Sequence, residues 1–166
     1  MTETWPISEA FFEALNRDDE LGCVVRAHLH IEYLVDKLLA HHFPEPSAIA
    51  RLHLDYADKV IVLEAFGYLP NLTKPLSAIG SLRNDFAHKL DYGLTKDRMD
   101  GLYNTFDSEG KQIIQESYQR TRKNSEESVP RKMGQLSPKD RFAMYAVNIH
   151  SMLALGYRKE TGRFPD

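Results

Sequence analysis

The chain has 166 residues and a formal net charge of −3, which suits one hydrophobic core and argues against a broadly basic surface for duplex DNA. Cys23 is the only cysteine, which excludes an internal disulfide and a multi-cysteine metal or iron–sulfur site. No apolar run approaches the roughly 20 residues that cross a bilayer. We therefore expect one domain over residues 1–166, located in the cytoplasm and away from membranes.

Apolar residues recur at three- and four-residue spacing from the N-terminus onward, which indicates helices rather than strands. We expect a first helix over residues 8–15 and a long second helix from Asp18 or Asp19 to about residue 42. Prolines follow it, and a third helix is expected over residues 47–66. The first half of the chain therefore predicts three helices.

The next predicted helix begins near Lys74 and Pro75, with Gly93 as its stop. Its expected apolar face consists of Leu76, Ile79, Phe86, Ala87 and Leu90.

Weaker patterns indicate helices around residues 99–106 and 113–118. Ser137 and Pro138 are typical of the start of a final helix, as N-cap and first helical residue. The chain as a whole predicts an all-α bundle of about five to seven helices.

Between the last two helices lies a polar, basic segment that we expect to form a loop over about 119–137. Its cations are the best local candidate for contact with phosphate, although a solvated loop is the more common explanation of such a run. The candidate phosphate contacts are Arg120, Arg122, Lys123, Arg131 and Lys132.

Three polar residues interrupt the helix expected after Lys74, and their chemistry suits a phosphodiester. Arg83 is a permanent cation, Asn84 forms hydrogen bonds through its amide, and His88 transfers protons near neutral pH. At about 100° per residue, Asn84 and His88 share one side of a helix, whereas Arg83 and His88 differ by about 140°. These three residues are the candidate catalytic group.

On this geometry Arg83 falls within the apolar stripe, so its guanidinium needs a partner. We consider an acidic residue from another helix, a local distortion of the helix, or a second subunit that completes a shared site. Asp91 and Tyr92 follow His88 and are candidate supporting residues, since Asp91 would lie near the imidazole if the helix continued. Alternatively, the polar residues form a buried network that only holds helices together.

The order Arg83-Asn84, three further residues and His88 resembles the R-N-x-x-x-H motif of HEPN proteins. That family's helical bundle agrees with the fold expected above, and many members are metal-independent endoribonucleases, often toxins or antiviral effectors. The resemblance implies His88 as general acid and base, Arg83 as the group that stabilises the charged phosphorane-like state, and Asn84 as the phosphate-positioning residue. It also implies a homodimer with the site at the interface, RNA as substrate, and no metal or cofactor.

A longer stretch resembles the mannitol-operon-repressor family, through residues 18–23, 51–69, the R-N-x-F-A-H segment and the final helix. Members of that family are regulators, so the alternative function is a non-catalytic regulator that acts through a protein partner. An antitoxin is the partner expected for a toxin. The chain departs from many HEPN toxins because Leu90 stands where they place a tyrosine, and Tyr92 follows instead.

Overall fold

The computed structural model describes residues 8–17, 19–125 and 129–165. In these ranges the chain is helical and contains no strand, which confirms the all-α prediction. Eight α-helices are present where about five to seven were expected, together with two short 3₁₀ helices. In chain order the elements are α1 (Glu9–Arg17), α2 (Glu20–His42), α3 (Pro46–Ala50), α4 (Tyr56–Ala65), η1 (Pro70–Leu72), α5 (Thr73–His88), α6 (Lys96–Asn104), α7 (Ser108–Asn124), η2 (Met133–Gln135) and α8 (Pro138–Thr161).

The single helix expected over residues 47–66 was wrong, because two helices occupy that stretch. The backbone at His53 has a φ of 50°, a left-handed conformation that interrupts the helix. Asp55 then caps α4 by accepting a hydrogen bond from the Asp58 N–H at 2.9 Å, and the two side chains form a capping box. A strong local start signal therefore begins a new helix inside an apolar pattern that had looked continuous.

Several other helix starts agree with the sequence. Asp19 accepts a hydrogen bond from the Gly22 N–H at 2.8 Å and caps α2. Ser137 caps α8 through the Asp140 N–H at 3.1 Å, and Pro138 occupies the first helical position. These caps satisfy backbone donors that have no partner within their own helix.

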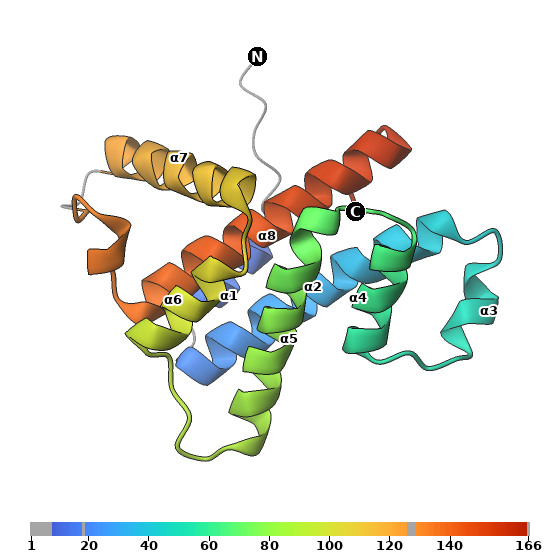
Figure 1. Ribbon diagram of the computed structural model, residues 1–166, viewed down its shortest axis with the longest axis horizontal. Helices are drawn as coiled ribbons and strands as arrows, with labels where there is room; N and C mark the ends of the chain where they lie inside the picture. Colours follow the sequence, from blue (N-terminus) through green and yellow to red (C-terminus); the bar gives the residue numbers. More distant parts are fainter. Residues whose placement is uncertain (1–7, 18, 126–128, 166) are drawn as a thin grey trace.

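The two longest helices, α2 and α8, form the centre of the fold and make the most extensive contact in it. Figure 1 shows them side by side across the middle of the molecule. Side chains such as Ile31, Leu38, Phe142 and Ile149 are fully buried between these helices and their neighbours. Each Å² of apolar surface that is buried stabilises the fold by about 25 cal/mol, and this burial is the main favourable contribution to such a core.

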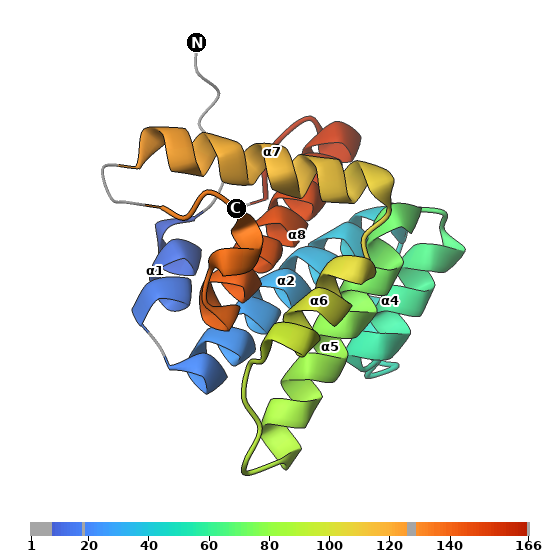
Figure 2. The same cartoon turned by 60° about the vertical axis from the view of Figure 1, so that its left-hand side comes forward.

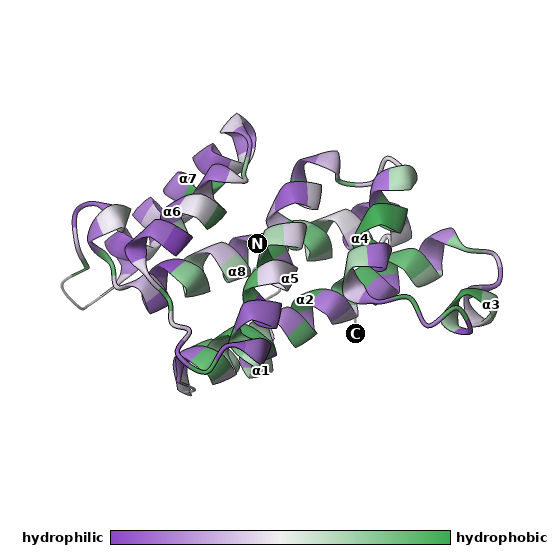
Figure 3. Ribbon diagram, turned by 60° about the horizontal axis from the view of Figure 1, so that its bottom comes forward, coloured by the Kyte–Doolittle hydropathy of each residue, from purple (hydrophilic) through white to green (hydrophobic). Residues whose placement is uncertain are grey.

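Shorter helices cover this central pair. α1, α4 and α5 pack on α2, whereas α6 and α7 pack on α8. In Figure 3, purple predominates on α6 and α7, consistent with their position on the outside of the bundle. Among the residues that the structure describes, no helix is both long enough and apolar enough to cross a membrane.

Candidate functional site

The three motif residues lie on the C-terminal half of α5. Figures 1 and 2 show this end of α5, with the loop that follows, extending from the body of the bundle. The helix ends at His88, because Lys89 is extended at φ −121° and ψ 115°. The stop expected at Gly93 was therefore too late. Leu90, which we predicted to be buried, follows the helix end and is fully exposed.

Arg83 does not lie in the middle of the apolar face, as the helical spacing had suggested. Its side chain is only half-buried, and the buried face of α5 is formed by neighbours such as Ile79, Leu82 and Phe86. The Arg83 Nη1 group donates a 2.9 Å hydrogen bond to Asn84 Oδ1. The partner of the guanidinium is thus the next residue in the chain, an arrangement that the sequence did not suggest.

Asn84 and His88 are both exposed and lie one turn apart on the same side of α5. Because α5 is regular from Thr73 to His88, no distortion of the helix is needed to bring them to one side. The hydrogen bond to Asn84 holds the guanidinium of Arg83 next to that side as well. The exposed amide of Asn84 therefore lies between the half-buried Arg83, to which it is hydrogen-bonded, and the exposed imidazole one turn further along.

Asp91 and Tyr92 do not continue this arrangement. Asp91 is exposed and lies beyond the end of α5. Because the helix does not continue past His88, the three-residue spacing does not place Asp91 and His88 on the same side of a helix. The Tyr92 ring packs edge-on against Phe86, with 5.1 Å between the centroids, and the Arg98 guanidinium lies 3.8 Å from its centroid. Hydrogen bonds from Lys89 and, to a smaller extent, from the Tyr92 hydroxyl hold the pKa of the Asp85 carboxyl below its ordinary value. Tyr92 thus fixes the loop after α5.

A cleft of about 480 Å³ lies between α2, α4 and α5, and Arg83 and Asn84 form part of its wall. We call it the Arg83 cleft. Gly80 allows α5 to approach the Tyr56 ring of α4 closely, because a Cβ atom at position 80 would lie 2.7 Å from that ring. The Tyr56 hydroxyl donates a 3.1 Å hydrogen bond to the Leu76 carbonyl, and burial raises the Tyr56 pKa. A close contact between α4 and α5 therefore shapes the cleft.

Charges of both signs line the Arg83 cleft. Glu32 accepts a 2.8 Å hydrogen bond from Lys59 Nζ, and its other oxygen lies 3.7 Å from His28 Nδ1. Burial lowers the pKa of His28, Glu32 raises it, and Arg83 and Lys59 lower it further. His28 is 2% exposed. The cleft was not apparent from the sequence because its residues come from three separate helices.

The basic segment expected as a loop over about 119–137 is partly helical. α7 continues to Asn124, so Arg120, Arg122 and Lys123 lie on its last turns, whereas Arg131 and Lys132 follow in the connection to α8. The Tyr118 hydroxyl donates to the Pro130 carbonyl and draws this connection back onto α7. Figures 1 and 2 show α7 and the motif end of α5 on opposite sides of the bundle. The structure therefore does not bring the basic residues to Arg83, Asn84 and His88 within one chain.

Comparisons with protein-family models, with curated proteins and with solved structures found no significant match. The resemblance to HEPN proteins and to the mannitol-operon-repressor family therefore stays a prediction from the motif.

Proposed function

We propose that the protein is a HEPN-like endoribonuclease that acts as a homodimer without a metal ion. The observation that carries this proposal is that Asn84 and His88 share one accessible side of α5 and that the half-buried Arg83 donates a hydrogen bond to Asn84. These groups supply the charge stabilisation, orientation and proton transfer that cleavage of a phosphodiester requires.

In the proposed reaction, the neutral imidazole of His88 removes the proton from a ribose 2′-hydroxyl. The 2′-oxygen forms a bond to phosphorus, the bond from phosphorus to the 5′-oxygen breaks, and the leaving 5′-oxygen takes a proton from the protonated imidazole of the partner subunit's His88. The products are a 2′,3′-cyclic phosphate and a 5′-hydroxyl end. Arg83 stabilises the additional negative charge in the transition state, while Asn84 orients the phosphate.

A homodimer completes this scheme because one imidazole cannot be both base and acid in the same step. The exposed position of His88 at the projecting end of α5 suits a pairing with the same end of a second chain. Leu90 lies two residues further on and exposes its whole apolar side chain. We infer that these two ends of α5 meet across the twofold axis and that Leu90 is covered there.

The alternative function is a non-catalytic regulator, and the mixed charge of the Arg83 cleft favours it. Glu32 and Asp55 line the same cleft as Arg83. Carboxylates repel the phosphates of an RNA chain, whereas a surface of alternating charge suits a protein partner. On this alternative, Arg83 and Asn84 would contact a protein that controls, or is controlled by, this chain.

The test is incubation of labelled RNA with the purified protein in EDTA, for the wild type, His88→Ala and Arg83→Ala. We expect cleavage by the wild type and a loss of about 10²-fold or more in each variant. His41→Ala and Arg51→Ala are matched controls, because they remove an exposed histidine and an exposed arginine away from the motif. Leu90→Glu should lower both the dimer fraction in light scattering and the cleavage rate. Intact RNA with all proteins over a broad substrate panel would reject the nuclease and leave the regulator.

A further inference from the structure

A pocket with basic walls lies where α6, α7, η2 and the first turns of α8 come together, and it has a volume of about 390 Å³. Figure 1 shows these four segments next to one another on the left of the molecule. None of the residues that line this pocket also lines the Arg83 cleft. We call it the Arg141 pocket, and its polar side chains include Asp100, Gln115, Gln119, Arg131, Lys132 and Arg141.

One wall of the pocket is formed by a buried cation. Arg141 is 4% exposed, its Nη2 group donates a 2.6 Å hydrogen bond to Asp100 Oδ1, and its Nε group donates to the Tyr145 hydroxyl at 3.2 Å. Asp100 is its only ion-pair partner among the described residues, and Asp100 also pairs with Lys96 at 2.7 Å. Because one carboxylate serves two cations, the charge of Arg141 is not fully balanced.

The connection between α7 and α8 adds two exposed cations to the pocket, Arg131 and Lys132. Their backbone is held on both sides, because the Pro130 carbonyl accepts a hydrogen bond from the Tyr118 hydroxyl and Met133 is buried in the core. Neither cation forms an ion pair with any residue that the structure describes. Both side chains are therefore available to an anion that enters the pocket.

The balance of charge favours a ligand with two negative charges. Arg131, Lys132 and Arg141 are three cations in the described lining, and Asp100 is the one anion, so two positive charges are in excess. Hydrogen bonds from Lys96 and Arg141 hold the pKa of Asp100 below its ordinary value, so this carboxylate is ionised at pH 7. A phosphomonoester carries about −1.5 to −2 at that pH, whereas the phosphodiester of an RNA chain carries about −1. The monoester therefore matches the pocket better.

The pocket also offers hydrogen bonds and space. Gln119 is an exposed amide of α7 on its wall, and the neighbouring Gln115 donates a 3.1 Å hydrogen bond to the Tyr103 hydroxyl. An amide can donate to a phosphate oxygen, and it adds direction to the attraction between charges. The volume lies within the range of about 300–1,000 Å³ that is usual for small-molecule sites, so an organic group fits beside the phosphate.

We propose that the Arg141 pocket binds the phosphate of a small phosphomonoester. The exposed cations Arg131 and Lys132 contact the phosphate oxygens, and Gln119 donates a further hydrogen bond. Arg141 attracts the phosphate through its charge and needs no direct contact, since the field of a partly buried cation extends over several ångströms. This binding does not depend on whether RNA is a substrate, because the pocket contains no residue of the α5 motif.

The experiment compares methyl phosphate with dimethyl phosphate, which has the single charge of an RNA linkage. Both are titrated into the full chain at pH 7.5 and constant ionic strength and followed by NMR. We expect methyl phosphate to shift the side-chain amide of Gln119 and to bind about tenfold more tightly than dimethyl phosphate. Arg131→Gln and Lys132→Gln should each weaken it severalfold. Lys123→Gln, an exposed lysine of α7 outside the pocket, should leave it unchanged, and so should His88→Ala.

Gly134 on the pocket wall allows a test that keeps every cation in place. Apart from its chain neighbours, no heavy atom of the described residues lies within 4 Å of a Cβ atom built there, so a side chain is tolerated. Gly134→Asp adds a carboxylate and should reduce the affinity for methyl phosphate at least tenfold relative to Gly134→Asn, which has the same size but no charge. Equal affinity of these two variants, tighter binding of dimethyl phosphate than of methyl phosphate, or equal binding of both esters would overturn the proposal. The absence of binding at millimolar concentration would overturn it as well.

Discussion

His28 and His150 are buried histidines on the two central helices, and in each the Nδ1 atom lacks a hydrogen-bond partner within the part of the chain that the structure describes. Their surroundings differ. His28 lies beside Glu32, which partly offsets the effect of burial on its pKa, whereas the only charged influence on His150 is His30, which acts in the same direction as burial. Burial is the main cause of the lowered pKa in both histidines, and neighbouring charge decides whether that effect is partly offset, as at His28, or increased, as at His150.

The largest expected effect concerns His150 in acid. Because the pKa of about 4 in the folded chain lies below the ordinary value of 6.5, the unfolded chain binds a proton that the folded chain does not. The free energy of unfolding should therefore fall as the pH drops from 6.5 to 4, by about 3 kcal/mol from this group. Urea unfolding of wild type and His150→Phe at several pH values measures it.

In His150→Phe this contribution is absent, so the variant should lose less stability than the wild type over that pH range. Groups that do not interact with His150 titrate equally in both proteins and cancel in the difference, with His30 as the exception because it contributes to the lowered His150 pKa. If the free energy of unfolding had the same pH dependence in both proteins, His150 would have its ordinary pKa in the folded chain, and the prediction would be wrong.

A smaller effect is expected when the carboxylate near His28 is neutralised. Glu32→Gln removes the group that raises the pKa of His28 and leaves Arg83 and Lys59, which lower it. NMR titration should therefore give a lower His28 pKa than in the wild type. The free energy of unfolding should fall by about 1 kcal/mol, since Lys59 keeps its 2.9 Å ion pair with Asp36. An unchanged or higher His28 pKa would contradict the comparison drawn above.

The smallest effect on stability is expected at the exposed histidine of the motif. His88→Ala should change the free energy of unfolding by no more than about 0.5 kcal/mol, because the side chain is exposed at the end of α5. Thermal unfolding next to wild type measures this. A loss of 1–3 kcal/mol, typical of a broken buried hydrogen-bond network, would instead favour the purely structural interpretation of the motif.

Local signals in the sequence were sufficient for much of the fold. Asp19 and Ser137 begin helices as expected, because capping depends on residues only a few positions apart. The same reasoning failed where two local signals competed. The apolar spacing around residues 47–66 favoured one helix, but the left-handed His53 and the Asp55 capping box divide it. Similarly, helical spacing extended α5 past His88, where the backbone had already become extended.

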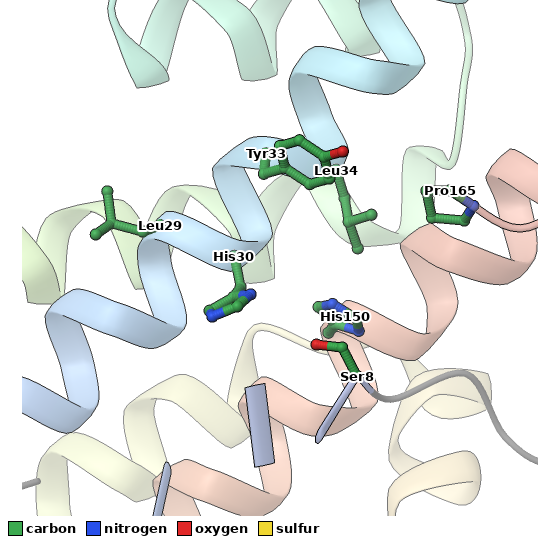
Figure 4. A pocket seen from close by; sticks show the side chains of 7 residues that line it. All are labelled: Ser8, Leu29, His30, Tyr33, Leu34, His150 and Pro165. Carbon is green, nitrogen blue, oxygen red and sulfur yellow. The ribbon is translucent and has the colours of Figure 1, made fainter. Parts of the chain in front are cut away.

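Contacts between distant parts of the sequence could not be predicted in this way. Tyr56 packs on Gly80, and Arg141 donates a 2.6 Å hydrogen bond to Asp100, but neither pair has a local pattern that identifies it. The sequence predicted Arg83, Asn84 and His88 as a motif. It did not predict the hydrogen bond from Arg83 to Asn84, because that bond depends on side-chain conformation. A hollow of about 450 Å³ is lined by residues of α2 and α8 together with Ser8 and Pro165 (Figure 4), and it has no signature in the sequence.

The α2 helix separates two spaces of different chemistry. His28 and His30 are two positions apart, so they point about 200° from each other around the helix. The His28 imidazole therefore faces the Arg83 cleft, which has charges of both signs, and the His30 imidazole faces a hollow shared with His150, whose described lining contains no Asp, Glu, Lys or Arg. This single helix therefore forms a wall of both spaces.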